Sequence, residues 1–273
     1  MHVADGLLPA PLCIGGYALG GLTLWWTLRQ SRREGRSQGR RSAHNIHHNI
    51  QPLETAPMTP DPLPLDHHRN IARAALLTAA FFVASSVRIA IPPTSVHFLL
   101  VGLMGALLGS LAFPAVVVGL TLQAILIGHG GLTVLGINAI ILGWPALAAG
   151  FLFRVCQSWA RPWLGRSRSA IAGGFLAGCG STGLVVLLFC GLLLFGITPD
   201  LNPDVERAAI LTIAIAHGPL MVMEGGITAA AIGFFQRVYP QLLPSFPVRS
   251  PAPTSASTSA PTPAPQSPQA LEP

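Results

Sequence analysis

Residues 98–128 read FLLVGLMGALLGSLAFPAVVVGLTLQAILIG, a stretch without a single charged side chain. About 20 apolar residues are enough for one helix to cross the hydrocarbon core of a bilayer, and this stretch accommodates a pair of short segments. The dipeptide Phe113-Pro114 near its middle predicts the turn between them, because proline is disfavoured inside a helix. The stretch therefore favours a membrane protein over a water-soluble one.

The rest of the chain repeats this pattern. Apolar residues make up 51% of the sequence and charged residues only 10%, against about a quarter charged in a typical soluble domain. Glycines inside the apolar runs, such as Gly102 and Gly105, predict close packing between helices. The runs predict an all-α, polytopic membrane protein of about seven transmembrane helices. The predicted segments are 10–28, 72–91, 96–112, 114–128, 132–153, 169–195 and 208–235.

The placement of arginine predicts the orientation. The chain has no lysine, and all of its arginines except Arg88 and Arg207 fall in or beside the links that share one face if about seven segments cross. Basic residues collect on the cytoplasmic side, which places the N-terminus outside and the C-terminus inside a bacterial inner (plasma) membrane. This distribution accounts for the net charge of +6. A nucleic-acid-binding surface is not indicated, because aromatic and basic residues do not interleave in the sequence.

Two stretches differ from the apolar segments. The link 29–71 is polar and lacks periodicity, so we expect a mobile cytoplasmic loop within a transmembrane domain that spans 1–240. Residues 245–273 are rich in Pro, Ser and Ala and are expected to be disordered, because such a composition cannot build a core. Histidine-rich tracts bind transition metals, so the link is either a metal buffer or a solvated connection. Its histidines are His44, His47, His48, His67 and His68.

The first two residues offer a metal chelate. The Met1 α-amine, the His2 amide nitrogen and the His2 Nδ1 can bind one ion in adjoining rings, provided that the chain starts at Met1 with its formyl group removed. Such nitrogen sets suit late first-row divalent ions in square-planar or tetragonal geometry. His97 follows the Pro92-Pro93 break on the same predicted face of the membrane. Its imidazole can supply a fourth nitrogen, and the alternative is an interfacial histidine bonded to a carbonyl.

Polar residues in or beside the apolar segments predict a hydrogen-bond network near this site. Glu224 is the only carboxylate within any predicted segment, and ionisable groups at such depth usually face a polar interior and serve function. We expect His129 and Asn138 to order the outer loop and Gln123 to bond with the same network. The candidates for this network are Ser95, Gln123, His129, Asn138 and Glu224.

Four motifs, taken in order, resemble those of a known family. They are MHVADGLLP at 1–9, PTSVH at 93–97, HGGLT at 129–133 and EGGIT at 224–228. Together they resemble the CbiM/NikM family, the substrate-binding membrane components of energy-coupling-factor transporters for cobalt and nickel. The resemblance covers the transmembrane domain without the 29–71 link.

This resemblance implies a mechanism. In the family, the N-terminal stretch folds back into the helical bundle, and the metal is held by groups that match the Met1 amine, the His2 amide and ring nitrogens, and His97. Transported Co²⁺ or Ni²⁺ is the implied ligand, with no organic cofactor. A coupling membrane protein, cytoplasmic ATPase subunits and a small accessory membrane protein complete such transporters. The sequence itself has no G-x-x-x-x-G-K-[ST] run for an ATPase site.

Two other function classes compete with this interpretation. An intramembrane metalloenzyme needs paired ligands such as H-E-x-x-H, which the sequence lacks. A stand-alone secondary permease typically shows internal repeats and broken helices, and neither is evident in the sequence. Within the resemblance, the stretch around His97 lacks a Gly-Thr-Ser-type run associated with some nickel members, which favours cobalt and a role in cobalamin biosynthesis.

Overall fold

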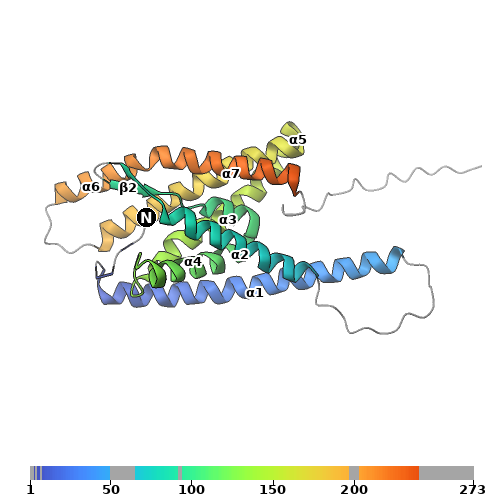
Figure 1. The fold of residues 1–273 in the computed structure, drawn as a ribbon, viewed down its shortest axis with the longest axis horizontal. Helices are drawn as coiled ribbons and strands as arrows, with labels where there is room; N and C mark the ends of the chain where they lie inside the picture. Colours follow the sequence, from blue (N-terminus) through green and yellow to red (C-terminus); the bar gives the residue numbers. More distant parts are fainter. Residues whose placement is uncertain are drawn as a thin grey trace, which may run out of the picture. The chain divides into compact units, whose positions relative to one another are not determined.

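The computed structural model describes residues 3, 5–6, 8–49, 65–91, 94–196 and 203–239. They form a helical bundle with one short hairpin (Figure 1), so the predicted predominance of helices is confirmed. The elements are α1 (Ala10–Asn49), α2 (Leu65–Ser86), β1 (Arg88–Ile91), β2 (Thr94–His97), α3 (Val101–Leu108), the 3₁₀ turn η1 (Gly109–Leu111), α4 (Ala112–Leu126), α5 (Leu135–Gly196), α6 (Pro203–Ala216) and α7 (Gly218–Val238).

Three stretches in the described part of the chain are long and apolar enough to cross a membrane. They are Val101–Leu126, Leu135–Leu194 and Ile210–Val238, and Asn70–Ser86 is a shorter apolar helix. Each of the predicted segments overlaps at least one helix of the structure. The number of crossings and their orientation stay predictions.

The helix α1 is longer than the sequence suggested. We expected a loop over 29–71, but α1 continues to Asn49 and α2 begins at Leu65. Arginine and glutamine are good helix formers, and Gln30 donates a hydrogen bond of 3.2 Å to Glu34 one turn later. The loop prediction was therefore wrong at both ends of the link.

The histidines of this link fall on the last turns of α1 and the first turn of α2. All described elements lie within the proposed transmembrane domain, 1–240. Residues 50–64 and 240–273 lie outside the described residues, and with them the tail that was predicted to be disordered.

A two-stranded hairpin interrupts the helices before α3. The strands β1 and β2 pair antiparallel, with Arg88 opposite His97. We expected helix up to Ile91 and again from Val96, with a break between them, but α2 ends at Ser86 and α3 begins only at Val101. Prolines at 92 and 93 separate the strands in the sequence, and proline disfavours helical backbone at the residue before it. The helix of the predicted second segment therefore ends earlier than expected, and the helix of the third begins later.

Other helix boundaries also differ from the predicted ones. The turn expected at Phe113-Pro114 lies earlier, at η1, and Pro114 occupies the first turn of α4, where a missing N–H costs little. The fifth and sixth segments form α5, which is interrupted at Gly165 (φ 73°, ψ 173°). The seventh segment is two helices, α6 and α7, which meet at His217. The sequence analysis did not find this break.

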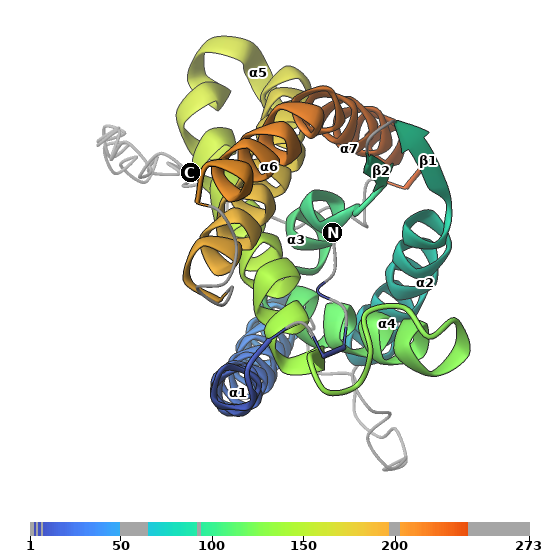
Figure 2. The same cartoon turned by 90° about the vertical axis from the view of Figure 1, so that its left-hand side faces the viewer.

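The short helix α3 lies near the centre of the bundle, among α2, α4, α5 and α7 (Figure 2). Glycines allow this close approach. A Cβ added to Gly102 would lie 2.5 Å from the Gly178 Cα of α5, and one added to Gly105 would collide with the Ala146 carbonyl. The tight packing predicted at Gly102 and Gly105 is thus confirmed.

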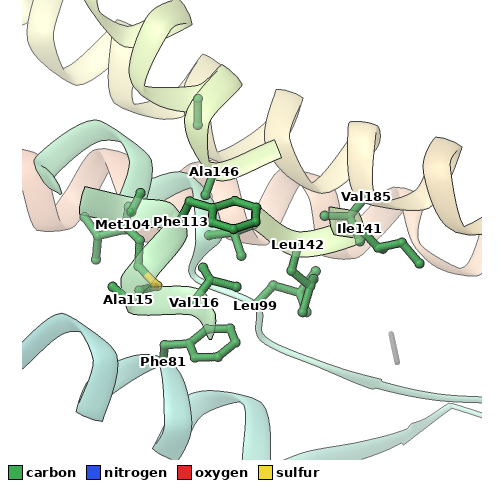
Figure 3. Close-up of a cluster of buried hydrophobic side chains, with 14 of the residues drawn as sticks. Phe81, Leu99, Met104, Phe113, Ala115, Val116, Ile141, Leu142, Ala146 and Val185 are labelled. Carbon is green, nitrogen blue, oxygen red and sulfur yellow. The ribbon is translucent and has the colours of Figure 1, made fainter. Parts of the chain in front are cut away.

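Large apolar side chains fill the space around α3 (Figure 3). Phe81 of α2, Phe113 of α4 and Leu142 of α5 are all fully buried. In a bilayer such contacts stabilise mainly through van der Waals packing, since lipid tails are as apolar as the side chains. The core therefore fixes the helices from which the polar residues of the candidate site project.

Candidate metal centre

The N-terminal stretch is held inside the bundle at Val3. The Val3 side chain is only 1% exposed. Its backbone N–H donates to Asn138 Oδ1 at 2.9 Å, and the Asn138 Nδ2 donates to the Val3 carbonyl at 3.1 Å. One buried asparagine on the first turn of α5 thus satisfies both polar groups of the Val3 backbone, as a neighbouring strand would.

Two further contacts join the N-terminal region to the loop before α5. The Thr133 N–H donates to Asp5 Oδ1 at 3.2 Å, and the Thr133 hydroxyl donates to the same oxygen. The Tyr17 hydroxyl of α1 donates to the Leu132 carbonyl. A Cβ added to Gly131 would collide with the Asp5 carboxylate, so the glycine makes room for it.

Met1 and His2, the predicted chelate, lie outside the described residues. The structure therefore describes the chain immediately after the chelate but not the chelate itself. Within the described ranges, no group of three or more His, Cys, Asp or Glu side chains is placed to hold a metal ion.

His97 closes the strand β2 at a buried position and is 6% exposed. Its ring lies against that of His129, with centroids 5.9 Å apart and planes at 81°. The His129 N–H donates to the Gln123 carbonyl at 3.2 Å, which anchors the start of the following loop to the end of α4. The structure thus brings together two histidines that are 32 positions apart in the sequence.

Glu224 of α7 is fully buried and binds the backbone directly after His97. Its Oε1 accepts a hydrogen bond from the Leu99 N–H. The Leu100 N–H lies 3.2 Å from Oε1 and 3.1 Å from Oε2. Leu100 has a positive φ of 49°, which is unfavourable for a residue with a side chain. The carboxylate therefore holds an unusual junction between β2 and α3 and sits where the α3 dipole favours negative charge.

Gln123 joins the network less directly than we expected. Its Nε2 donates to the Ser85 hydroxyl of α2, which in turn donates to the Phe81 carbonyl at 2.5 Å. Its Oε1 is buried and has no hydrogen-bond partner among the described residues. Gln123 therefore ties α4 to α2 through its side chain and reaches His129 only through its backbone carbonyl.

The structure also involves polar residues to which the sequence analysis gave no role. Asp5 and Thr133 lie within the motifs quoted above. Their polar side chains within these motifs were the signal that could have indicated a role in the site. His217 is buried at the α6–α7 break, with Nδ1 2.7 Å from the Ile213 carbonyl. The backbone of Ser95, a predicted network residue, lies in β2 opposite Ala90.

The sequence matches a known family over most of this bundle. The family model described as "Cobalt uptake substrate-specific transmembrane region" matches residues 64–242. That range includes the hairpin and every helix from α2 to α7 in full. It contains His97, His129, Asn138 and Glu224.

Curated relatives carry related descriptions. A protein of Haemophilus influenzae whose name refers to metal transport is 31% identical over 169 residues, which are 62% of this chain and 78% of that protein. The cobalt transport protein CbiM of Sorangium cellulosum is 29% identical, over 65% of this chain and 78% of that one. The fused nickel transport protein NikMN of Rhodobacter capsulatus is 29% identical, over 67% of this chain and 55% of that one.

A solved structure shares the fold. The crystal structure of a transition metal transporter superposes with a TM-score of 0.57 at 18% identity, and covers 87% of this chain and 93% of its own. At this level of identity the likeness concerns the arrangement of helices alone.

Proposed function

The chain belongs to the CbiM family of cobalt uptake transmembrane proteins, and on that premise we propose that it is the substrate-specific subunit of an energy-coupling-factor transporter for Co²⁺ or Ni²⁺. It binds the ion with high affinity at the outer face of a bacterial inner membrane. A coupling membrane protein and cytoplasmic ATPase subunits supply the energy, and a small accessory membrane protein takes part. The subunit itself has no catalytic role.

The observation that carries the proposal is the capture of Val3 by Asn138. Val3 directly follows His2 in the chain, so a fixed Val3 backbone limits where a chelate built on His2 can form. Consecutive Cα atoms are about 3.8 Å apart, which leaves the His2 amide little freedom relative to Asn138. The site proposed here combines the Met1 amine, the His2 amide nitrogen, the His2 ring and His97.

Neighbouring residues support this ligand set. A buried polar side chain that binds backbone rather than solvent restrains the chain around a metal ligand, and such outer partners commonly tune affinity. Asn138 acts on the N-terminal side of the site, and Glu224 acts on the chain just after His97. In this proposal Ser95, Gln123 and His129 belong to the surrounding network and not to the metal itself.

Cobalt is the preferred ion in this proposal, with the metal destined for cobalamin biosynthesis. The family description names cobalt, and the motif around His97 favours cobalt as well. One relative is a nickel transport protein, and nitrogen-rich sites accept both ions. Metal analysis by mass spectrometry, on protein purified from cells supplied with both ions, decides between them.

The test of the proposal uses the free amino terminus. Protein with its native start and protein with residues added before Met1 are titrated calorimetrically with Co²⁺ and Ni²⁺. We expect tight binding by the native form and its loss in the extended form, because the added peptide bond removes the amine from the chelate. Equal affinity in both forms would refute the amino-terminal chelate.

A stand-alone secondary permease is the second candidate, and the break between α6 and α7 is the observation that favours it, since broken helices are common in such carriers. Uptake into vesicles separates the two. Uptake by the energy-coupled transporter requires the coupling protein, the ATPase subunits and ATP. Uptake by this chain alone under an ion gradient would instead identify a permease.

A further inference from the structure

A groove runs between α5 and the last third of α7, away from the candidate metal centre. Its volume is about 410 Å³, within the range of about 300–1,000 Å³ typical of small-molecule sites. Its apolar lining comes from Ile171 of α5 and from Ala229, Ala230, Gly233 and Phe234 of α7. Arg237, in the last turn of α7, is the last lining residue along that helix.

Small residues of α7 leave space for the groove. Gly233 has no side chain, and a Cβ added there would meet Ile171 Cδ1 at 3.7 Å. Phe234, which is 56% exposed, also lines the groove. The polar end is fixed by a reciprocal pair in which the Ser167 hydroxyl donates to Gln236 Oε1 at 2.7 Å and Gln236 Nε2 donates to the Ser167 carbonyl at 3.4 Å.

Positive charge gathers at this end of the groove. Arg237 is exposed in the last turn of α7, and no acidic side chain in the described part of the chain forms an ion pair with it. Arg166 and Arg168 flank Ser167 in the sequence and are also exposed. A cation beside hydrocarbon is costly unless it is paired, so an anion at Arg237 would be favoured.

We propose that this groove binds one anionic phospholipid, with an acyl chain along Gly233 and Ala229 and the phosphate at Arg237. The order of the lining, apolar first and cationic at the end, matches the order of groups in a phospholipid. This end of α7 is the predicted cytoplasmic end, and the cytoplasmic leaflet carries anionic lipids that bind basic pockets between transmembrane helices. A helix of a partner protein would bury the apolar walls, but it would match the charge of Arg237 only if it placed an acidic residue there.

The experiment is native mass spectrometry of the full chain released from bilayers of phosphatidylglycerol and phosphatidylcholine in equal amounts, with identical acyl chains. We expect the wild type to retain one phosphatidylglycerol in preference to phosphatidylcholine. Arg237→Gln should lower that preference about fivefold, the effect of removing one basic residue near a charged membrane surface. Arg207→Gln removes an exposed arginine from α6, outside the groove, and should leave the preference unchanged.

Gly233→Leu fills the groove without changing the charge and should reduce retention of both lipids. Should this variant fold poorly, the comparison of Arg237→Gln with Arg207→Gln still decides the proposal. Equal retention of the two lipids by the wild type, or an unchanged preference in Arg237→Gln, would overturn it. So would a Gly233→Leu variant that keeps its lipid but no longer co-purifies with a coupling membrane protein, because the groove would then belong to a partner helix.

Discussion

Replacing Asn138 by leucine tests how far the capture of Val3 controls metal binding. Leucine branches at Cγ as asparagine does and is somewhat larger, but it neither donates nor accepts a hydrogen bond. The change removes the 2.9 Å and 3.1 Å hydrogen bonds to Val3, each worth about 1 kcal/mol net. If the bound state requires an ordered N-terminal stretch, the loss of about 2 kcal/mol weakens binding about 30-fold. The variant also leaves the buried N–H and C=O of Val3 without partners, which makes the expected loss of affinity larger.

The assay is calorimetric titration of Co²⁺ into the variant in detergent, with the thermal unfolding of the metal-free protein measured beside it. Thr78→Val is the matched control, because it also removes a buried polar group that binds backbone. The Thr78 hydroxyl donates to the Ala74 carbonyl of α2 at 2.8 Å and lies 3.4 Å from the Ala115 carbonyl of α4. Thr78→Val should leave cobalt affinity unchanged. A folded Asn138→Leu protein with wild-type affinity would show that Val3 is not positioned for metal binding.

Three other outcomes are expected. His97→Ala should weaken cobalt binding by more than the roughly 100-fold seen for outer-sphere partners, and calorimetry showing normal binding would move the fourth ligand to another residue, with His129 the next candidate. Glu224→Gln keeps an acceptor for Leu99 but loses the charge, so cobalt affinity should fall about tenfold, the low end for outer partners, while whole-cell uptake falls further. A loss of binding as complete as in His97→Ala would place Glu224 at the metal. A reporter fused after Leu243 should be active only in its cytoplasmic form, and periplasmic activity would refute the predicted orientation.

The sequence predicted the apolar segments well and their breaks poorly, for a physical reason. Hydropathy measures how favourably a stretch leaves water and does not report its backbone conformation. Residues 88–97 are apolar enough to extend two predicted helices, yet they form a hairpin. Short apolar runs fit strand and helix equally well by periodicity. Conversely, the charged residues after position 28 favour helix by propensity, and α1 continues through them.

The pairings at the candidate site could not be read from the sequence. Val3 and Asn138 are 135 positions apart, and Leu99 and Glu224 are 125 apart. The principle that buried polar groups find partners predicted that Asn138 and Glu224 would be bonded. It did not predict that each would bind backbone, because the choice of partner depends on how the helices pack around α3.

Because both bind backbone, Asn138 and Glu224 have the same structural role. Asn138 holds the chain one residue after His2, and Glu224 holds it two residues after His97. Each proposed ligand thus lies on a segment without regular helical restraint, the N-terminal stretch or the end of a short strand, and each segment is fixed by a side chain from a long helix. Such segments can move when α5 or α7 moves, which a site confined to one rigid helix could not do. If the proposed ligand set is right, displacement of either helix would separate the His2 half of the site from the His97 half and so release the ion. Metal affinity in the assembled transporter should therefore depend on the positions of α5 and α7 relative to each other.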